Sequence, residues 1–141
     1  DATAHQSAMH CVEDGIYEYQ QTDEQLRMCR KGSHLAALER ASSANLQVSG
    51  TNLVWLLVVD FPRVVERLGA RGIRLAHIEM GWIAQGLGCS LTVDGLFARP
   101  CRAFREPLLD DLLHLAPSET VGYQIVCGRD RCHDVLSDLR C

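Results

Sequence analysis

The chain has 141 residues, 47% of them hydrophobic, which is enough for one domain with a sizeable core. Its formal net charge is −4 and no basic run stands out, so a nucleic acid is not the expected main partner, because phosphate binding needs a basic surface. The longest apolar run, residues 53–59, is far shorter than the roughly 20 residues that a membrane span requires. We therefore expect neither nucleic acid nor a membrane as partner.

The cysteine content is high, and the number of cysteines is odd: Cys11, Cys29, Cys89, Cys101, Cys127, Cys132 and Cys141. A disulfide scaffold is typical of small secreted chains with poor cores. Here the apolar content is ample and no secretory signal is visible, so we expect reduced thiols and a cytoplasmic location. Cys127 and Cys132, with His133 beside them, lack the spacing of a zinc knuckle, and we predict no metal site.

The chain opens on Asp1 rather than Met, and we expect a processed product or an excised piece of a longer protein. Residues 1–14 have no clear period and are expected to form a tail or the remnant of a longer element. Residues 15–20 (GIYEYQ) alternate and are rich in aromatic side chains, which predicts a strand, and residues 25–29 predict a second strand that closes a hairpin. A helical pattern follows over residues 35–44.

Residues 53–59 (LVWLLVV) are apolar without alternation. That pattern predicts a central strand covered on both faces. Pro62 is suited to the first turn of the helix that follows, and the glycines within residues 69–72 predict a break before the next helix.

The stretch from Arg71 to Phe104 is the one around which we expect the fold to be built. Its first half predicts a long central helix, because apolar residues recur there at three- and four-residue intervals: Ile73, Ala76, Met80, Ile83, Ala84 and Leu87. A helix that is apolar over so much of its surface should be buried, either in a core or against a partner chain.

The remaining elements complete a sheet covered by helices. A short extended piece is expected up to Cys101, then a helix over 108–115 with inward leucines, then a strand over 120–127 that Gly128 ends. Residues 129–141 are expected to hold a terminal helix around Val135, Leu136 and Leu139. The fold class predicted is α+β, a mostly antiparallel sheet packed with helices around the long central helix.

General catalytic motifs are scarce. The chain has no Walker loop, no GxGxxG after a strand, no GxSxG and no HExxH. His77 and Glu79 are two residues apart and so point to different faces of a helix. Asp110 and Asp111 are adjacent and are interpreted as a solvated helix edge rather than a catalytic pair.

The order and spacing of several stretches are more informative than these general motifs. Residues 15–19 read GIYEY, residues 126–129 read VCGR, and the central helix carries Arg71, Arg74, Ile78-Glu79, Gly81 and Ala84-Gln85. Together they resemble the nitroreductase superfamily, and within it the SagB-type azoline dehydrogenases, FMN enzymes that oxidise thiazolines and oxazolines in peptide natural products. The resemblance covers roughly residues 14–131 and implies a truncated nitroreductase-like domain over 15–131, with a C-terminal extension over 132–141.

The departures from this pattern imply a truncated and degenerate member. The family's arginine-rich segment for the FMN phosphate precedes the tyrosine-rich strand, and this chain starts too late to include it. The Lys-Tyr pair implicated in azoline oxidation falls at Arg67-Leu68, and a leucine cannot transfer a proton.

The resemblance also implies a vestigial flavin cleft lined by four residues: Trp82, Gln85, Cys101 and Arg102. Arg129 and Arg131 remain as phosphate partners, although two arginines without a nest of backbone donors make a weak anion site. The catalytic residues, if there are any, are not identifiable from the sequence.

Three interpretations follow from the resemblance. The first is a degenerate SagB-like protein of natural-product biosynthesis that acts on a peptide or carrier-bound intermediate without stand-alone FMN oxidation. The second is a small subunit that completes the FMN site of a heteromeric oxidoreductase, such as a cyclodipeptide-oxidase-like complex. The third is a fragment of an FMN-dependent azoline oxidase. We expect FMN to be absent from the isolated chain or weakly held, and a homodimer or a heterodimer with a full-length nitroreductase-family protein.

Overall fold

The computed structural model describes residues 12–42, 48 and 51–129, and the chain divides into two compact units, Asp1–His34 and Leu35–Cys141. The described residues form five strands and four helices: β1 (Gly15–Gln20), β2 (Gln25–Lys31), α1 (Leu35–Ala41), β3 (Leu53–Asp60), α2 (Phe61–Leu68), α3 (Arg71–Val93), β4 (Leu96–Cys101), α4 (Glu106–Leu113) and β5 (Glu119–Arg129). The predicted terminal helix within 129–141 lies outside the described residues, apart from Arg129.

The first unit is the predicted hairpin. β1 and β2 pair antiparallel, and β2 continues two residues beyond the predicted end at Cys29. Glu24 adopts a left-handed conformation in the turn (φ 53°). Exposed ion pairs join the strands and their flanks, one between Arg27 and Glu18 and one between Lys31 and Glu13.

The second unit is built on a three-stranded antiparallel sheet in the order β3-β5-β4. The prediction that residues 53–59 form the central strand is wrong, because β5 is central and β3 lies at an edge of this sheet. The apolar run has another cause. Helices cover both faces of the sheet, so even an edge strand has apolar side chains on both of its faces.

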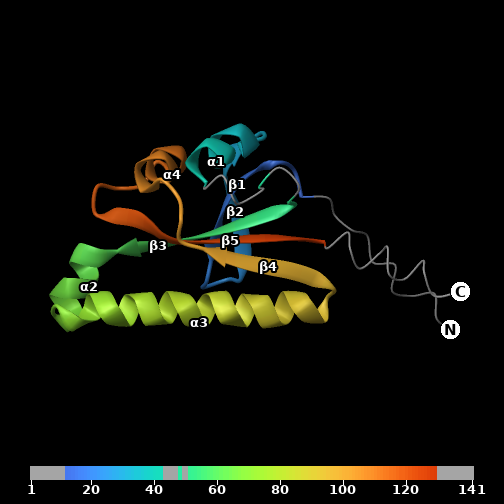
Figure 1. The fold of residues 1–141 in the computed structure, drawn as a ribbon. Coiled ribbons are helices and arrows are strands. Elements are labelled where there is room, and N and C mark those ends of the chain that lie inside the picture. The colour runs from blue at the N-terminus through green and yellow to red at the C-terminus, as the bar shows by residue number, and fades with distance from the viewer. Residues whose placement is uncertain (1–11, 43–47, 49–50, 130–141) are drawn as a thin grey trace, which may run out of the picture. The chain divides into compact units, whose positions relative to one another are not determined.

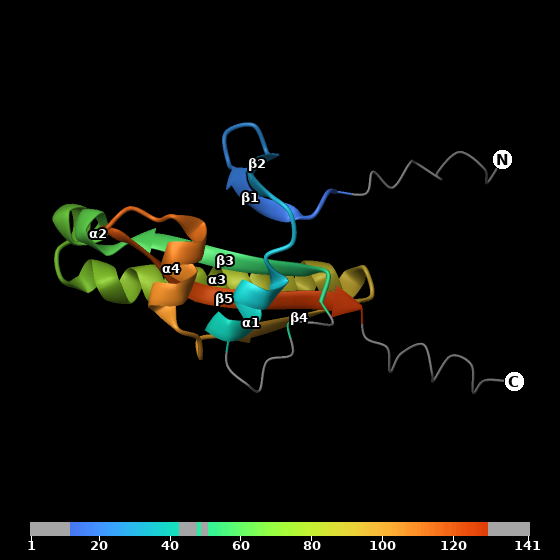
Figure 2. The same ribbon diagram turned by 90° about the horizontal axis from the view of Figure 1, so that it is seen from above.

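The helices form a layer on each side of the sheet. Figures 1 and 2 show α3 along one face, and α1 and α4 on the other. On the α1 and α4 side, the fully buried Ala41, Leu109 and Val121 form one core cluster. On the α3 side, Ala84 packs with Ile125 and Cys127 of β5.

Two glycines of β5 let it pack closely against its neighbours. Gly122 lies at a bulge opposite the junction of Leu57 and Val58, and a Cβ there would be 2.5 Å from the sulfur of Met80 on α3. Gly128 was predicted to end the strand, but β5 runs through it to Arg129. The ring of Phe97 covers this glycine, with its Cε1 3.1 Å from where a Cβ would stand. Gly128 therefore serves packing rather than termination.

Local signals set the ends of α2, and the positions of Pro62 and of the glycine break agree with the prediction. Asp60 caps α2, because its Oδ1 accepts a hydrogen bond from the Arg63 backbone N at 3.0 Å, and Pro62 lies in the first turn. Gly69 ends α2 in a left-handed conformation (φ 66°). After Ala70, α3 runs for 23 residues.

The inner face of α3 differs in part from the prediction. Ala76, Met80 and Ala84 are buried as expected, whereas Ile73 and Ile83 are 43% and 44% exposed. Small residues define the buried stripe at four-residue steps from Gly72, and this brings the isoleucines to its margins. The predicted inward position of Leu108 is also wrong, since its side chain is exposed and Leu109 is the buried residue of α4.

The predicted fold class is confirmed. An antiparallel sheet, helices on both faces and one long helix make an α+β architecture. In the described part of the chain, no helix is both long and apolar enough to cross a bilayer.

Candidate functional site

A polar cluster forms where three elements meet at one end of the sheet. β3 and β4 are both antiparallel to β5, so they run in the same direction and end at the same side. Phe61 follows the end of β3, Arg102 follows the end of β4, and His77 lies on the first half of α3. The Phe61 and His77 rings stack with centroids 5.3 Å apart and an angle of 23° between their planes.

Hydrogen bonds fix the orientation of the His77 ring. Its Nδ1 is 2.7 Å from the backbone oxygen of Ile73, and its Nε2 is 3.3 Å from Nη2 of Arg102. A carbonyl can only accept and a guanidinium can only donate, so the two contacts together require a proton on Nδ1 and a lone pair on Nε2. This neutral tautomer holds Arg102 without cancelling its charge.

Arg102 is therefore a positioned cation. It is exposed, and no ion pair to it is found among the described residues. A guanidinium has five N–H donors in a fixed fork, which suits a carboxylate or a phosphate. We name Phe61, His77 and Arg102 the His77 cluster.

Trp82 and Gln85 lie on a different surface. Both are on the solvent face of α3, where Trp82 is 78% exposed. Trp82 is five residues beyond His77, which places it about 140° further around the helix. Gln85 Nε2 is 3.4 Å from the sulfur of Cys89 on the same face. These two predicted cleft residues are thus neighbours of one another, but not of the His77 cluster.

Cys101 faces the opposite side of the sheet from α3. Its side chain packs with the cluster of Val48 and Val126, and its sulfur accepts a hydrogen bond from the Ala103 backbone N at 3.3 Å. Although Cys101 and Arg102 are adjacent in sequence, the Cys101 side chain packs on the α1 and α4 side of the sheet, whereas Arg102 contacts His77 of α3. A strand sends successive side chains to opposite faces, which accounts for the separation.

Of the two predicted phosphate partners, Arg129 is far from Arg102 along the sheet. Arg129 pairs with Leu96, at the start of β4, while Cys101 at its end pairs with Gln124. Five residues of strand separate the two ends by about 17 Å. Arg131 lies outside the described residues.

A buried polar pair on the α1 and α4 side was missed by sequence reasoning. Gln124 is fully buried in the centre of the sheet, and its Nε2 donates to Oγ of Ser42 at 2.9 Å. The backbone of Ser42 also forms an isolated antiparallel β-bridge with Phe104. The two residues are 82 positions apart, so no local sequence signal points to this pair. It joins the end of α1 to the central strand.

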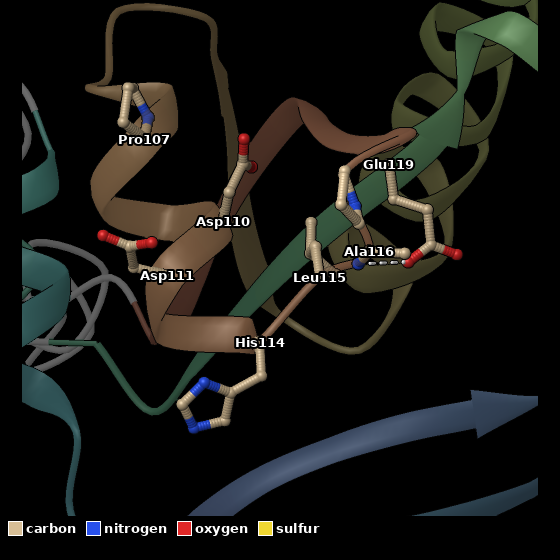
Figure 3. A pocket seen from close by; sticks show the side chains of 8 residues that line it. Pro107, Asp110, Asp111, His114, Leu115, Ala116 and Glu119 are labelled. Atoms are coloured by element: carbon tan, nitrogen blue, oxygen red, sulfur yellow. Dashed lines mark hydrogen bonds between the residues drawn. The ribbon is translucent and has the colours of Figure 1, made fainter.

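A shallow depression lies between the end of α4 and the start of β5 (Figure 3). Asp110 accepts hydrogen bonds from Thr120 Oγ1 at 3.0 Å and from the Val121 backbone N at 2.9 Å. Glu119 accepts one from the Ala116 backbone N at 3.1 Å. The interpretation of Asp110 as a solvated edge is wrong, because both of its carboxylate oxygens bind β5. These carboxylates hold a turn together.

Among the described cysteines of the second unit, we identify none that is a nucleophile of the His77 cluster. Burial raises the pKa of the Cys127 thiol, which keeps it protonated and unreactive. Cys89 is exposed on α3. Among the residues that the structure describes, no group of three or more histidine, cysteine, aspartate or glutamate side chains is placed to hold a metal ion.

Comparison with known proteins identifies the fold of this chain, but it does not identify a sequence family. No family model matches the chain, and no curated protein matches its sequence. A candidate nitroreductase from Anabaena variabilis superposes with a TM-score of 0.80 at 21% identity, over 86% of this chain and 25% of that chain. A chain of the E. coli microcin synthetase complex McbBCD, solved with truncated pro-MccB17 bound, gives 0.73 at 15% identity, over 82% of this chain and 44% of that chain.

This chain has a nitroreductase-like fold, and it spans a quarter of the first neighbour and under half of the second. The resemblance implies FMN, and the described residues of a single chain do not fit it. Trp82 and Gln85 face solvent on α3, the side chain of Cys101 lies on the opposite face of the sheet, and Arg129 of β5 pairs with the start of β4. In the described residues, these positions do not form one cradle for a flavin.

Proposed function

We propose that this chain is a degenerate nitroreductase-like protein of natural-product biosynthesis, which binds a peptide or carrier-bound intermediate without stand-alone FMN oxidation. The observation that carries the proposal is the separation of the four predicted cleft residues onto different surfaces of one chain. The likeness to a chain of a microcin synthetase complex, solved with a truncated pro-peptide, supports the peptide context.

The His77 cluster is the part of this site that we assign to binding. Arg102 is held by a neutral imidazole, so its positive charge remains available to an anionic group of the intermediate, either a carboxylate or a phosphate. His77 acts as a positioning residue, because its Nδ1–H is committed to the Ile73 carbonyl. Phe61 stacks on the imidazole and holds its plane.

A second candidate function is that of a small subunit that completes the FMN site of a larger partner. The observation that favours it is the exposed apolar surface of α3, which includes Trp82 at 78% exposure. A full-length nitroreductase-family protein would supply the phosphate-binding segment, and this chain would supply one wall of the cleft.

The absorption spectrum of the purified chain, with and without added FMN, tests the proposal. We expect a colourless protein that does not quench FMN fluorescence. Flavin colour that appears only when a full-length nitroreductase-family protein is co-purified would support the small-subunit function instead. A yellow protein on its own would overturn both and favour the fragment of an azoline oxidase.

Product analysis in the producing cells tests the assignment of Arg102. We expect Arg102→Gln to lower the amount of pathway product at least tenfold. The matched control is Arg99→Gln, which removes the same charge from an exposed position on the neighbouring strand β4. An equal loss in both variants would mean that general charge, and not the His77 cluster, matters.

A further inference from the structure

The second ring nitrogen of His77 is the atom of the His77 cluster whose protonation can change. Nδ1 carries the proton that is donated to the Ile73 carbonyl, and Nε2 is 3.3 Å from Nη2 of Arg102, from which it accepts. The lone pair on Nε2 is therefore the place where the ring can take up a proton. Adding that proton would set two donors against each other.

An anion placed between His77 and Arg102 would change this balance. Without one, an imidazolium would stand 3.3 Å from the guanidinium with no hydrogen bond to join them, and like charges at such a distance repel. With one, both groups donate to the anion, and the charges alternate in sign. The proton on Nε2 and a bound anion therefore stabilise each other.

We propose that an anionic oxygen group of the intermediate enters between His77 and Arg102, and that its binding adds one proton to Nε2 of His77. Nε2–H then donates to one oxygen of the ligand and the guanidinium donates to another. The proton comes from solvent, and no covalent bond of the ligand forms or breaks. The inference rests on the proposed function and deepens it, because it makes His77 a second ligand-binding residue whose charge follows the ligand.

The surroundings of the ring suit both of its charge states. The hydrogen bond from Nδ1 to the Ile73 carbonyl is the same in the imidazole and in the imidazolium, so the ring need not rotate when Nε2 takes up a proton. Phe61 stacks on the ring with centroids 5.3 Å apart, within the roughly 6 Å over which an aromatic face attracts a cation. These two contacts keep Nε2 aimed at the same place before and after binding.

The acidic groups closest in sequence to the packed residues are directed elsewhere. At the start of α2, the Asp60 carboxylate accepts hydrogen bonds from the Arg63 backbone N at 3.0 Å and from Oγ of Ser118 at 3.2 Å. On α3, Glu79 is two residues beyond His77 and so points to a different face. The negative charge opposite Nε2 is thus left to a ligand.

The basic groups favour an anion with more than one charge. Arg74 is three residues before His77, so the two side chains are neighbours on the surface of α3. On α2, Arg63 and Glu66 follow the stacked phenylalanine by two and five residues, which turns them about 200° and 140° around the helix from it. Arg74 is therefore the additional charge that we assign to the site, and a doubly charged oxyanion should bind more tightly than a singly charged one.

Sulfate and acetate test the proposal, because neither changes its own charge between about pH 6 and pH 9. We expect the affinity of the wild-type chain for sulfate to fall with rising pH by up to about tenfold per unit, the slope for uptake of one proton. Acetate should follow the same direction and bind more weakly. Calorimetry in two buffers of different protonation enthalpy counts the proton, and the NMR signal of the His77 ring shows where it is bound.

His77→Gln separates proton uptake from positioning. A glutamine amide still accepts a hydrogen bond from Arg102 but takes up no proton, so the affinity for sulfate should no longer change with pH. The matched control is His114→Gln, the same substitution at an exposed histidine that ends α4, and it should keep the pH dependence. Proton uptake that persists in His77→Gln would overturn the proposal. So would a wild-type chain whose affinity for sulfate is the same throughout this range, a measurement that needs no variant.

Arg74→Gln tests the additional charge. We expect it to weaken sulfate binding about fivefold or more and acetate binding less. The matched control is Arg71→Gln, which removes the same charge one turn earlier and about 120° around the helix from His77, and which should weaken sulfate binding less than about twofold. Acetate that binds as tightly as sulfate to the wild type would overturn the preference for a double charge.

Arg102→Gln separates this inference from the proposed function. Sulfate binding that is independent of pH in the wild type, but lost in Arg102→Gln, would overturn the proton uptake and leave Arg102 as the anion-binding residue. A wild-type chain that binds neither sulfate nor acetate would overturn the proton uptake and the assignment of Arg102 together.

Discussion

The two faces of α3 are both apolar, and they differ in the size of their side chains. The buried residues of the inner face, which packs on the sheet, are Gly72, Ala76, Met80 and Ala84, and the partly buried Leu87 and Leu91 extend it. The outer face carries Ile78 and Trp82 at 50% and 78% exposure. Large apolar residues are usually buried, so the exposed Ile78 and Trp82 depart from the ordinary rule.

The difference shows which face of α3 is packed within a single chain. Small residues on the inner face let α3 approach β5 closely, as the contact of Met80 over Gly122 shows. The outer face has no such neighbour among the described residues of its own unit, and its large side chains are exposed. Within one chain, the inner face should therefore govern folding.

The largest expected effect comes from a charge placed on the inner face. Ala84→Glu would bury a carboxylate against Ile125 and Cys127, which we expect to cost about 3 kcal/mol or more of the free energy of unfolding. Gln85→Glu places the same charge on the adjacent, exposed residue and should change that free energy by less than about 0.5 kcal/mol. Urea unfolding of both variants makes the measurement, and equal losses would contradict the comparison.

A smaller effect is expected where the inner face touches the sheet. Gly122→Ala would put a Cβ 2.5 Å from the Met80 sulfur, and the side chain of Met80 must move to accommodate it. We expect a loss of about 1–3 kcal/mol, the range for overpacking a core. Gly81→Ala is the control, because nothing lies within 4 Å of its Cβ position and alanine favours a helix by up to about 1 kcal/mol. A stabilised Gly122→Ala would show that the packing is loose.

The opposite face of the sheet differs from the α3 side in that it buries a polar pair, Ser42 and Gln124. Ser42→Ala would leave the buried amide of Gln124 without its hydrogen-bond partner, at a cost of about 1–3 kcal/mol. Adding Gln124→Leu removes the polar group as well, and we expect the double variant to recover part of the loss. A double variant that is less stable than Ser42→Ala would mean that Gln124 stabilises the sheet by another contact. Thermal unfolding of the three proteins decides.

The sequence predicted those elements whose signals are local. Pro62 and Gly69 marked the ends of α2, and the apolar period over residues 73–87 marked α3 as a long helix, because capping and periodicity depend on neighbouring residues. The α+β class followed from the order of elements. The place of β3 in the sheet did not, since a strand covered by helices on both faces looks the same at the centre and at the edge.

The candidate site was predictable only in part, because its contacts are long-range. Arg102 was selected from the sequence, but its partner His77 is 25 residues away, and the fold brings the two together. The pair of Ser42 and Gln124 spans 82 residues and left no pattern. Trp82 was selected as a cleft residue, yet its surface is the face of α3 for which a second chain is proposed.

The smallest expected effect lies in the hairpin, whose exposed pairs are ionic rather than apolar. A hydrogen bond and the charge of Arg27 lower the pKa of Glu18 from its ordinary value of 4.5, so the folded hairpin binds fewer protons than the unfolded one. The contribution is present above pH 4.5 and is lost as the pH falls through the lowered pKa. An NMR titration of Glu18 should show this shift, and Arg27→Gln should remove it. The control Lys31→Gln, whose amine pairs with Glu13, should leave it in place. A Glu18 that titrates normally in the wild type would mean that the pair is not populated in solution.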